Sequence, residues 1–453
     1  MTRISVLLLI FAGFAGELHA QQPASKTTWS LRECIEYAFE NNLAIKRREL
    51  MVRNDEIDLH EAKFLRYPTL NAGGQSGLRW GRSIDPTSNQ FVSRRIASMG
   101  FSGTGSVTVF EGLQITNQIE QSKTNLQASR YDLEDAKNNI ALEVVSLYLN
   151  VIFNRELVKN AERQLEVANL QLEQTAKMVE AGAAPLSNQL EIEAQKASYE
   201  VEVVRSQNEL DLSILRLKQA LLIQADQSFE IEDPEIEVDE TEILQYSSSL
   251  VFENAMQTQP VVKSAHLRAK SGELGIRIAR GALAPSVSII GNIFTNYSDA
   301  AQRPSGSPNG EGYPLFDQFG DNLSQSLTLN LSIPILNGLR ARSNVQRAII
   351  AREEAGIYVE ETRQQLRQTI ETAYNDAVAA SKSYQASLKQ VEALEESFRS
   401  IQRRYSLGAE SFVNFQVAQN NLFNAQYDLL RAKYEYVYRI KVLDFYMGRP
   451  LTL

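Results

Sequence analysis

The strongest constraint on the fold is an internal repeat, because two halves with the same spacing of structural signals are expected to fold alike. The segment 42–45, which opens with Asn42, aligns with 259–262, and Pro68 aligns with Pro285. Both pairs have the same separation along the chain. The residue before a Pro is held out of the helical region, so each of these Pro residues marks the end of a helix. The fold of the first half therefore predicts that of the second.

Farther along the chain, the offset between the halves increases once and is then constant again. Gly112 corresponds to Gly338, and Gly182 corresponds to Gly408. The change falls within 299–322, a stretch rich in Gly, Pro, Asn and Ser, where a loop accommodates an insertion. One insertion in an otherwise constant register indicates a duplicated fold.

Each half predicts the same order of elements: a helix, two strands, a long helix and a shorter return helix. The first half is predicted to have helices over 30–66, from 112 to 180 and on to about 222, with strands near 70–80 and 98–110. The second half is predicted to have helices over 247–280, from 339 to 406 and on to about 447, with strands near 286–297 and 325–335.

The long helix of the first half carries an apolar seam between positions 140 and 179. Twelve positions at alternating spacings of four and three are apolar at all but Asn154 and Thr175. This is the pattern of a coiled coil. At 1.5 Å per residue the helix is about 100 Å long. Each return helix has roughly half that length, and the helix predicted over 30–66 is of similar length. Two such short helices stacked end to end would therefore match one long helix.

The predicted strands alternate between apolar and polar residues. Leu327, Leu329 and Leu331 share one face of 325–333, and 103–109 alternates more weakly. Such strands suit a wall with lipid on one side and water on the other. Four strands are too few to close a barrel, which needs about eight, and open edges cannot face lipid. We therefore expect several copies to contribute their strands to one barrel and their helices to one bundle. The alternative is a soluble sheet with covered edges, packed on a helical hairpin.

The segment 1–20 predicts a secretory signal peptide. Arg3 precedes an apolar run over 4–14, and the small side chain of Ala20 favours cleavage before Gln21. No later apolar stretch is long enough to span a bilayer as a helix, which takes about 20 residues. We therefore expect the mature chain to leave the cytoplasm without transmembrane helices.

Composition argues against nucleic-acid binding and against most enzymes. The chain has 453 residues and a net charge of −9, without the basic footprint that nucleic acid requires. Its single Cys, Cys34, excludes an intramolecular disulfide, and we expect it to be a small buried apolar residue rather than a nucleophile. We expect no cofactor, no metal site and no catalysis.

An acidic segment separates the two halves. The segment 226–242 is rich in Asp and Glu and contains no basic residue, and the spacing of its carboxylates matches no calcium-loop template. We expect a solvated linker with a short strand around Ile231, Ile236 and Val238.

Taken together, these features resemble the TolC-type outer membrane efflux protein family over essentially the whole mature chain. The resemblance rests on the duplicated order of elements and on short motifs in that order. These motifs are the Tyr-Pro and Ala-Pro strand starts, the Phe-x-Gly-Leu and Ile-Pro-Ile-Leu-Asn-Gly strand exits, and the Ala-Gly-Ala and Leu-Gly-Ala helix tips. The resemblance implies a mainly α fold with membrane β structure. Long coiled-coil helical hairpins would form a periplasmic α-barrel, and three copies with four strands each would form a twelve-stranded outer membrane β-barrel.

The resemblance also implies a function and a set of partners. The chain would be the outer membrane exit duct of a tripartite efflux pump or type I secretion system, and it would conduct substrates passively. Its partners would be itself as a homotrimer, a periplasmic adaptor protein, an inner-membrane pump of the RND or ABC type, and outer membrane lipid. A periplasmic adaptor is the alternative function, although an adaptor would have one hairpin rather than two at a constant offset.

The implied organisation has four parts. They are a signal peptide over 1–20, a first repeat over 21–225, the acidic linker over 226–246 and a second repeat over 247–453.

The resemblance places adaptor docking and a gate at the helix tips, at the periplasmic end. Docking is expected at Ala181, Gly182, Ala183, Leu407, Gly408 and Ala409. In the best-known members of the family, a Tyr and an Arg bind an Asp across the closed gate, and a ring of Asp lies nearby. Here Tyr405 stands at the Tyr position, Glu410 at the Arg position, Asn188 at the Asp position and Asn414 at one ring position. The chain thus lacks the usual ion pair and the acidic ring. We expect hydrogen bonds of Tyr405, Asn188 or Asn414, or else Arg403 and Arg404, to close the gate.

Overall fold

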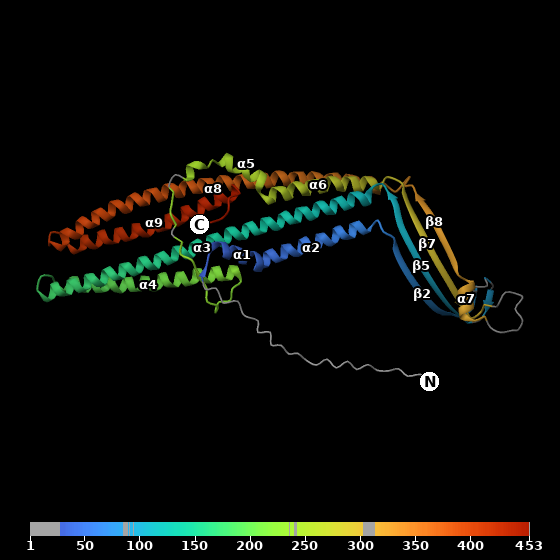
Figure 1. Cartoon of the computed structure of the whole chain (residues 1–453), viewed down its shortest axis with the longest axis horizontal. Coiled ribbons are helices and arrows are strands. Elements are labelled where there is room, and N and C mark those ends of the chain that lie inside the picture. The colour runs from blue at the N-terminus through green and yellow to red at the C-terminus, as the bar shows by residue number, and fades with distance from the viewer. Residues whose placement is uncertain are drawn as a thin grey trace, which may run out of the picture.

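The computed structural model describes residues 28–84, 89, 91–93, 95–234, 236–239, 242–301 and 313–452. Within these ranges the molecule is elongated: long helices run from a sheet at one end to two helical hairpin turns at the other (Figure 1). The predicted signal peptide lies outside the described residues.

The two halves contain the same main elements in the same order. The first half has α1 (Leu31–Asn41), α2 (Leu43–Phe64), β2 (Thr69–Arg79), β5 (Ile96–Glu111), α3 (Gln114–Glu180) and α4 (Leu186–Leu221). The second half has α5 (Ser248–Thr258), α6 (Pro260–Gly281), β7 (Ser286–Ser298), β8 (Ser324–Ser332), α8 (Arg340–Ser406) and α9 (Phe412–Tyr446). Shorter elements are β1 (Thr28–Trp29), β3 (Arg82–Ile84), β4 (Phe91–Ser93), β6 (Glu230–Ile231), the 3₁₀ helix η1 (Glu242–Gln245) and α7 (Leu315–Asp321).

The helices predicted over 30–66 and 247–280 are each interrupted once, so the prediction of two single helices was wrong. The first is divided at Asn42, whose ψ of 129° is extended and whose side chain accepts a hydrogen bond from the Ala44 N–H at 2.8 Å. The second is divided at Gln259, which has a ψ of 127° because Pro260 follows it. Asn42 and Gln259 correspond to each other in the repeat, so both halves have the same break.

Four strands form one antiparallel sheet in the order β2, β5, β7, β8, which confirms the four predicted strands. The strand register follows the repeat. Thr69 pairs with Ser106 in the first half, and their counterparts, Ser286 and Ser332, pair in the second.

Helix α7 lies in a stretch where the sequence predicts only a loop. The Gln318 side chain accepts a hydrogen bond from the Ser298 N–H at 2.9 Å and donates one to the Ser298 carbonyl at 3.0 Å. The Asn322 amide donates to the carbonyl of Asn296 at 2.8 Å. These bonds satisfy backbone groups of β7 beyond Phe294, the last residue of β7 that pairs with β8.

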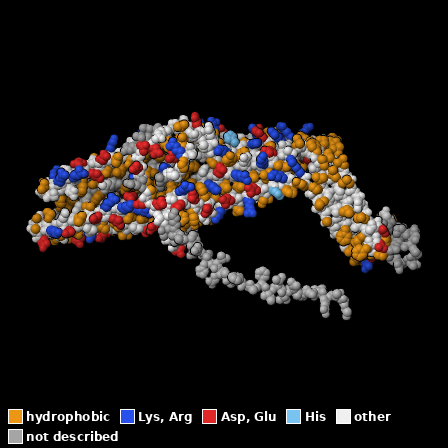
Figure 2. All heavy atoms as spheres, in the orientation of Figure 1, with side chains coloured by type: hydrophobic (Ala, Val, Ile, Leu, Met, Phe, Trp, Pro, Cys, Tyr) orange, Lys and Arg blue, Asp and Glu red, His pale blue; other side chains and the backbone are white. Residues whose placement is uncertain are grey.

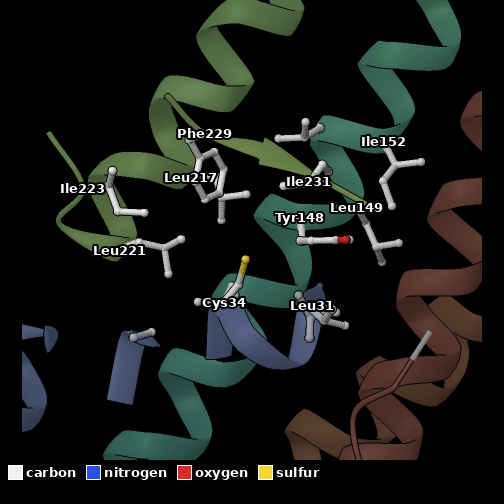
Figure 3. Packing of buried hydrophobic residues seen from close by; sticks show 14 of the residues in the cluster. Leu31, Cys34, Tyr148, Leu149, Ile152, Leu217, Leu221, Ile223, Phe229 and Ile231 are labelled. Atoms are coloured by element: carbon white, nitrogen blue, oxygen red, sulfur yellow. The ribbon is translucent and has the colours of Figure 1, made fainter. Parts of the chain in front are cut away.

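The seam of α3 is packed as the sequence predicts: seven of its twelve positions are buried and none is exposed. Figure 3 shows the largest cluster, where α1, α3 and α4 meet the segment that follows α4. The labelled side chains are Leu31, Cys34, Tyr148, Leu149, Ile152, Leu217, Leu221, Ile223, Phe229 and Ile231. Each fully buried Leu or Ile contributes about 1.5–3 kcal/mol to folding.

The acidic linker is anchored by its first residues. Strand β6 pairs in parallel with β1, and the Tyr148 hydroxyl donates to the carbonyls of Trp29 and Glu232 at 3.2 and 3.3 Å. The strand is shorter than predicted, because Pro234 has no N–H to continue a ladder. Ile236 and Val238 pack against the buried cluster outside any strand.

None of the helices in the described ranges combines the length and the hydropathy that crossing a bilayer requires.

Candidate functional site

One face of the sheet is apolar and exposed. The register places Leu70, Gly105, Gly291 and Leu327 in one row across the four strands. Every second residue along each strand points to the same face. Its apolar side chains are those of Leu70, Ala72, Leu78, Ala97, Met99, Phe101, Val107, Phe110, Val287, Ile289, Ile293, Leu327, Leu329 and Leu331. Leu70 and Leu327 are each 81% exposed. Figure 2 shows hydrophobic and uncharged side chains over much of the sheet, whereas charged side chains cover the helices.

The opposite face of the sheet is mostly polar. Asn71, Thr104, Asn292 and Ser326 form the neighbouring row, in which the Thr104 hydroxyl donates to the Asn292 side-chain oxygen at 3.0 Å. The same face carries Thr69, Gln75, Ser98, Ser102, Ser106, Thr108, Ser288, Asn296, Ser324, Thr328, Asn330 and Ser332, with Ile96, Ile290 and Phe294 as large apolar exceptions. A sheet with these two faces suits a boundary between lipid and water.

The two end strands of the sheet each have one free edge. Within the described part of the chain, β2 pairs with β5 alone and β8 pairs with β7 alone. In lipid, no water satisfies the N–H and C=O groups of an open edge. The sheet therefore needs strands from another chain to complete its hydrogen bonding in a membrane.

The two helical hairpins turn at the end of the molecule opposite the sheet (Figure 1). Gly182 and Gly408 have φ values of +71° and +72°, a conformation that favours glycine. The Ala183 N–H bonds the Met178 carbonyl at 2.8 Å, and the Ala409 N–H bonds the Arg404 carbonyl, also at 2.8 Å. Both turns are thus Schellman motifs with the same hydrogen bonds, at corresponding positions of the two halves. We call residues 181–185 and 407–411 the tip.

The side chains predicted for docking lie on the surface of the tip. Ala181, Gly182, Ala183, Leu407, Gly408 and Ala409 are all exposed, Leu407 by 82%. Apart from the glycine itself and its two chain neighbours, no described residue has an atom within 4 Å of the place where a Cβ on Gly182 or Gly408 would be. The tip therefore presents a small-residue surface with one prominent Leu at the α8–α9 turn.

The structure brings two of the four predicted gate residues together. The Asn414 amide donates to Glu410 at 2.8 Å and the Ser411 N–H donates at 3.3 Å, while Arg404 forms an ion pair with Glu410 at 3.3 Å. The hydrogen bonds from Asn414 and Ser411, together with the Arg404 charge, hold the pKa of Glu410 below its usual range. Glu410 therefore remains ionised, and its contacts stabilise the α8–α9 turn within one chain.

Tyr405 packs inside the same hairpin. Its ring stacks on Phe415 with 4.8 Å between centroids and contacts Phe412 at 6.0 Å. Ile192 of the other hairpin joins this cluster, which also includes Phe398. Burial raises the pKa of the Tyr405 hydroxyl, so the phenol is neutral at physiological pH.

Asn188 is separate from the other gate candidates. It lies in the first turn of α4, is half-buried, and its N–H donates to the Pro185 carbonyl at 3.1 Å. Sequence reasoning missed the aromatic cluster of Phe398, Phe412 and Phe415. The signal was the spacing of Phe412 and Phe415, which places both on one face at the start of α9.

Cys34 is fully buried in the cluster of Figure 3. Burial raises the pKa of its thiol to about 12, so the thiol is protonated at neutral pH. A protonated, inaccessible thiol is a poor nucleophile.

The sequence matches a family model described as outer membrane efflux protein over residues 35–221 and 251–449. Outer membrane protein TolC of Escherichia coli is 24% identical over 345 residues, which cover 74% of this chain and 68% of that protein. Antibiotic efflux pump outer membrane protein ArpC of Pseudomonas putida is 23% identical over 419 residues, which cover 88% of this chain and 79% of that protein.

Solved structures of similar shape are also outer membrane proteins. The outer membrane protein VceC from Vibrio cholerae aligns with a TM-score of 0.76 and 16% identity, over 93% of this chain and 96% of that one. The Campylobacter jejuni CmeC outer membrane channel aligns with a TM-score of 0.72 and 17% identity, over 92% and 85%. These likenesses confirm the predicted fold class. Since the family model covers most of both halves, the chain belongs to the outer membrane efflux protein family.

Proposed function

We propose that three copies of this outer membrane channel protein form a passive exit duct. The observation that carries the proposal is the sheet, which has an exposed apolar face, a polar face and, among the residues that the structure describes, two edges without a partner strand. Its four strands alternate in direction, so the last strand of one copy is antiparallel to the first strand of the next. Three copies would close a twelve-stranded barrel with the polar face toward the lumen and the apolar face toward lipid.

The helices supply the part of the duct that extends from the outer membrane into the periplasm. α3 and α8 have 67 residues each, about 100 Å at 1.5 Å per residue. The apolar side chains of Ile350 and Ile357 on α8 are exposed in the single chain and need a neighbouring helix, which a further copy provides. The tip then lies far from the membrane, where a periplasmic adaptor docks against the residues of both turns and connects the duct to an inner-membrane pump of the RND or ABC type.

The proposal includes the organisation expected from the sequence. Residues 1–20 direct export and are removed, 21–225 and 247–453 form the two repeats, and 226–246 joins them. The duct has no catalytic activity, and transport energy comes from the pump. The relatives are channel proteins, and the two hairpins at a constant offset do not favour the adaptor alternative.

The gate of this duct would differ from one closed by an ion pair between copies. Glu410 is already engaged by Arg404 and Asn414 of its own hairpin. Closure would then depend on how the hairpins pack against one another. The α8–α9 hairpin is stabilised by Glu410 and by the stack of Tyr405 on Phe415, and Asn188 lies on the other hairpin.

A deletion strain tests the function. Loss of the duct should increase sensitivity to at least one class within a panel of dyes, detergents, bile salts and metal ions, and the wild-type gene should restore resistance. Unchanged sensitivity to the whole panel, with the protein absent from the envelope fraction of the wild type, would contradict the proposal.

A further inference from the structure

Helix α7 packs on the apolar face of the sheet, at the end away from the long helices (Figure 1). The ring of Phe319 meets the ring of Phe101 edge to face with 5.4 Å between centroids, and the Thr295 hydroxyl donates to the Phe319 carbonyl at 2.7 Å. Phe101 and Thr295 lie opposite each other on β5 and β7, and both point to the apolar face. α7 therefore lies on the side of the sheet that meets lipid in the proposed barrel.

α7 takes the place of a strand where β8 ends. Ser324, the first residue of β8, pairs with Phe294, whereas β7 continues to Ser298. Beyond Phe294, backbone groups of β7 form hydrogen bonds with the side chains of Gln318 and Asn322 instead. Gln318 is fully buried. These bonds fix the rotation of α7 about its axis, and with it the direction of the other side chains.

The sides of α7 that do not contact the sheet differ in polarity. Phe316 lies one turn before Phe319 on the neighbouring side and is 82% exposed. Asp317 and Asp321 each lie about 160° from Phe319 around the helix axis, since a helix turns by about 100° per residue. Both are exposed. α7 is thus amphipathic, with an exposed apolar side next to the sheet and an acidic side away from it.

The level of α7 along the barrel follows from β5. Phe101 and Phe110 both lie on the apolar face and are nine residues apart, with Phe110 at the end of the sheet that joins the long helices. At about 3.3 Å per residue and a strand tilt of about 40°, this separation is roughly 23 Å along the barrel axis. The apolar band of outer membrane barrels is about 25 Å tall. Phe101 and α7 therefore lie near the outer boundary of the band.

The composition of the apolar face agrees with this level. From the row of Phe110 to the row of Phe101, the face carries no charged side chain among the described strand residues. Farther out, the face acquires the hydroxyls of Ser76 and Tyr297, which lie in one row. Tyr is typical of the region where acyl chains give way to headgroups.

A hollow of about 520 Å³ lies at the same level of the sheet. Its lining includes Ala72, Phe101, Ile293 and Leu323. Ile293 and Leu323 are each 46% exposed. An exposed apolar surface of this kind indicates a contact with lipid or with another protein. Lipid is favoured because the hollow and the apolar side of α7 continue the face that the barrel turns toward the membrane.

We propose that α7 is an interfacial helix of the outer leaflet, at the boundary between acyl chains and headgroups. Phe316 and Leu323 lie among the acyl chains, one of which occupies the hollow, and the acidic side of α7 faces water. This inference rests on the proposed barrel, because that barrel turns the apolar face toward lipid. It names the lipid contact that fixes the depth of the duct in the membrane.

Single cysteines that carry a fluorescent label test the two sides of α7 in the full-length protein. Phe316→Cys and Leu323→Cys place the label on the lipid side, and Asp317→Cys is the matched control on the acidic side. All three side chains are exposed, and the native Cys34 is fully buried, so the parent protein reports background labelling. The labelled proteins are reconstituted in phosphatidylcholine vesicles. One quencher is a nitroxide near the start of the acyl chain of added phosphatidylcholine, and the other is iodide in the water on both sides.

We expect the nitroxide to quench the labels at 316 and 323 about threefold more strongly than the label at 317, since the two sides of an interfacial helix lie at different depths. Iodide should show the reverse order. Equal quenching of all three labels by the nitroxide overturns the proposal. Protection of the label at 316 from both quenchers also overturns it, because a neighbouring copy would then cover Phe316.

Native mass spectrometry of the same proteins separates failure of this inference from failure of the duct. Trimers whose labels at 316 and 323 show no preference for the nitroxide overturn the interfacial helix and leave the duct intact. Absence of trimers in the parent protein overturns the proposed function itself.

Discussion

Gly281 lies so close to Gly112 that a Cβ atom on Gly281 would be 2.6 Å from the Gly112 carbonyl oxygen. This contact joins the two halves where the sheet meets the helices. Gly281→Ala should force the two segments apart, at a cost of about 1–3 kcal/mol in unfolding free energy. Thermal unfolding in detergent, followed by circular dichroism, should show a lower midpoint for this variant.

Gly356→Ala is the matched control, because Gly356 also lies in a helix but has its nearest side-chain atom 4.0 Å from the place of a Cβ. Ala is favoured over Gly in helices by about 1 kcal/mol, so this variant should unfold at the same or a higher temperature. Equal midpoints for the two variants would show that the Gly112–Gly281 contact is not tight.

The two faces of β8 should respond in opposite ways to charge. Leu329 lies on the apolar face and Thr328 on the polar face, and both are exposed in the single chain. Leu329→Arg should cost about 2–4 kcal/mol near the bilayer midplane, whereas Thr328→Arg should cost little because water solvates the lumen. The measurement is the amount of heat-resistant oligomer in the outer membrane fraction. Equal loss in both variants would show that neither face lies against lipid.

Glu410 makes the α8–α9 turn sensitive to acid. Its pKa is lowered in the folded protein by Asn414, Ser411 and Arg404, so the ionised form is the stabilising one. Its contribution is therefore complete at neutral pH and is lost only as the pH falls below the ordinary Glu value of about 4.3. Hydrogen-exchange protection of the Gly408 and Ala409 amides, corrected for intrinsic rates, should decrease between about pH 6 and about pH 3.

Glu410→Gln removes the charge, and this variant should have low protection at both pH values. Glu396→Gln removes a surface ion pair with Arg399, 2.9 Å long, from the same hairpin away from the turn. It should leave the protection of the turn unchanged. Full protection in Glu410→Gln would show that packing alone fastens the hairpin.

Large charged residues at the tip should abolish export without preventing assembly. Gly182→Arg and Gly408→Arg place a bulky side chain where each turn is open to solvent and where φ favours glycine. A deletion strain that carries either variant should be no more resistant to the exported compounds than the same strain with an empty vector, while the variant proteins still form trimers. Gly320→Arg, at a glycine of α7 with equally open surroundings near the sheet, should retain resistance. If the tip variants fail to assemble, the two turns are structural and are not docking surfaces.

The long helices and the four strands were predictable because strong local signals bound them. α3 and α8 end at Glu180 and Ser406, just before the glycines that mark the breaks in the sequence. The alternation over 325–333 indicated both the strand and its faces. These signals depend on neighbours in sequence, so no tertiary knowledge was needed.

Other features depended on tertiary contacts. The break at Asn42 was missed because the apolar periodicity continues through it, although its alignment with Gln259-Pro260 held the necessary signal. Helix α7 was missed because it is stabilised by the bonds of Gln318 to Ser298 of β7. Near the tip, the sequence located the gate candidates only relative to the two helix breaks. The stacking of Tyr405 on Phe415 depends on the rotation of α9, which one sequence does not fix.

The central claim is that a single chain cannot satisfy the N–H and C=O groups at the edges of its sheet in a membrane, and that it therefore forms one sheet with the strands of other copies. Native mass spectrometry of the protein extracted from envelopes in mild detergent measures this directly. The account predicts the mass of three mature chains, with no stable monomer at the same detergent concentration. A monomer that remains folded in solution without detergent, with the helix content of the intact protein, would contradict it.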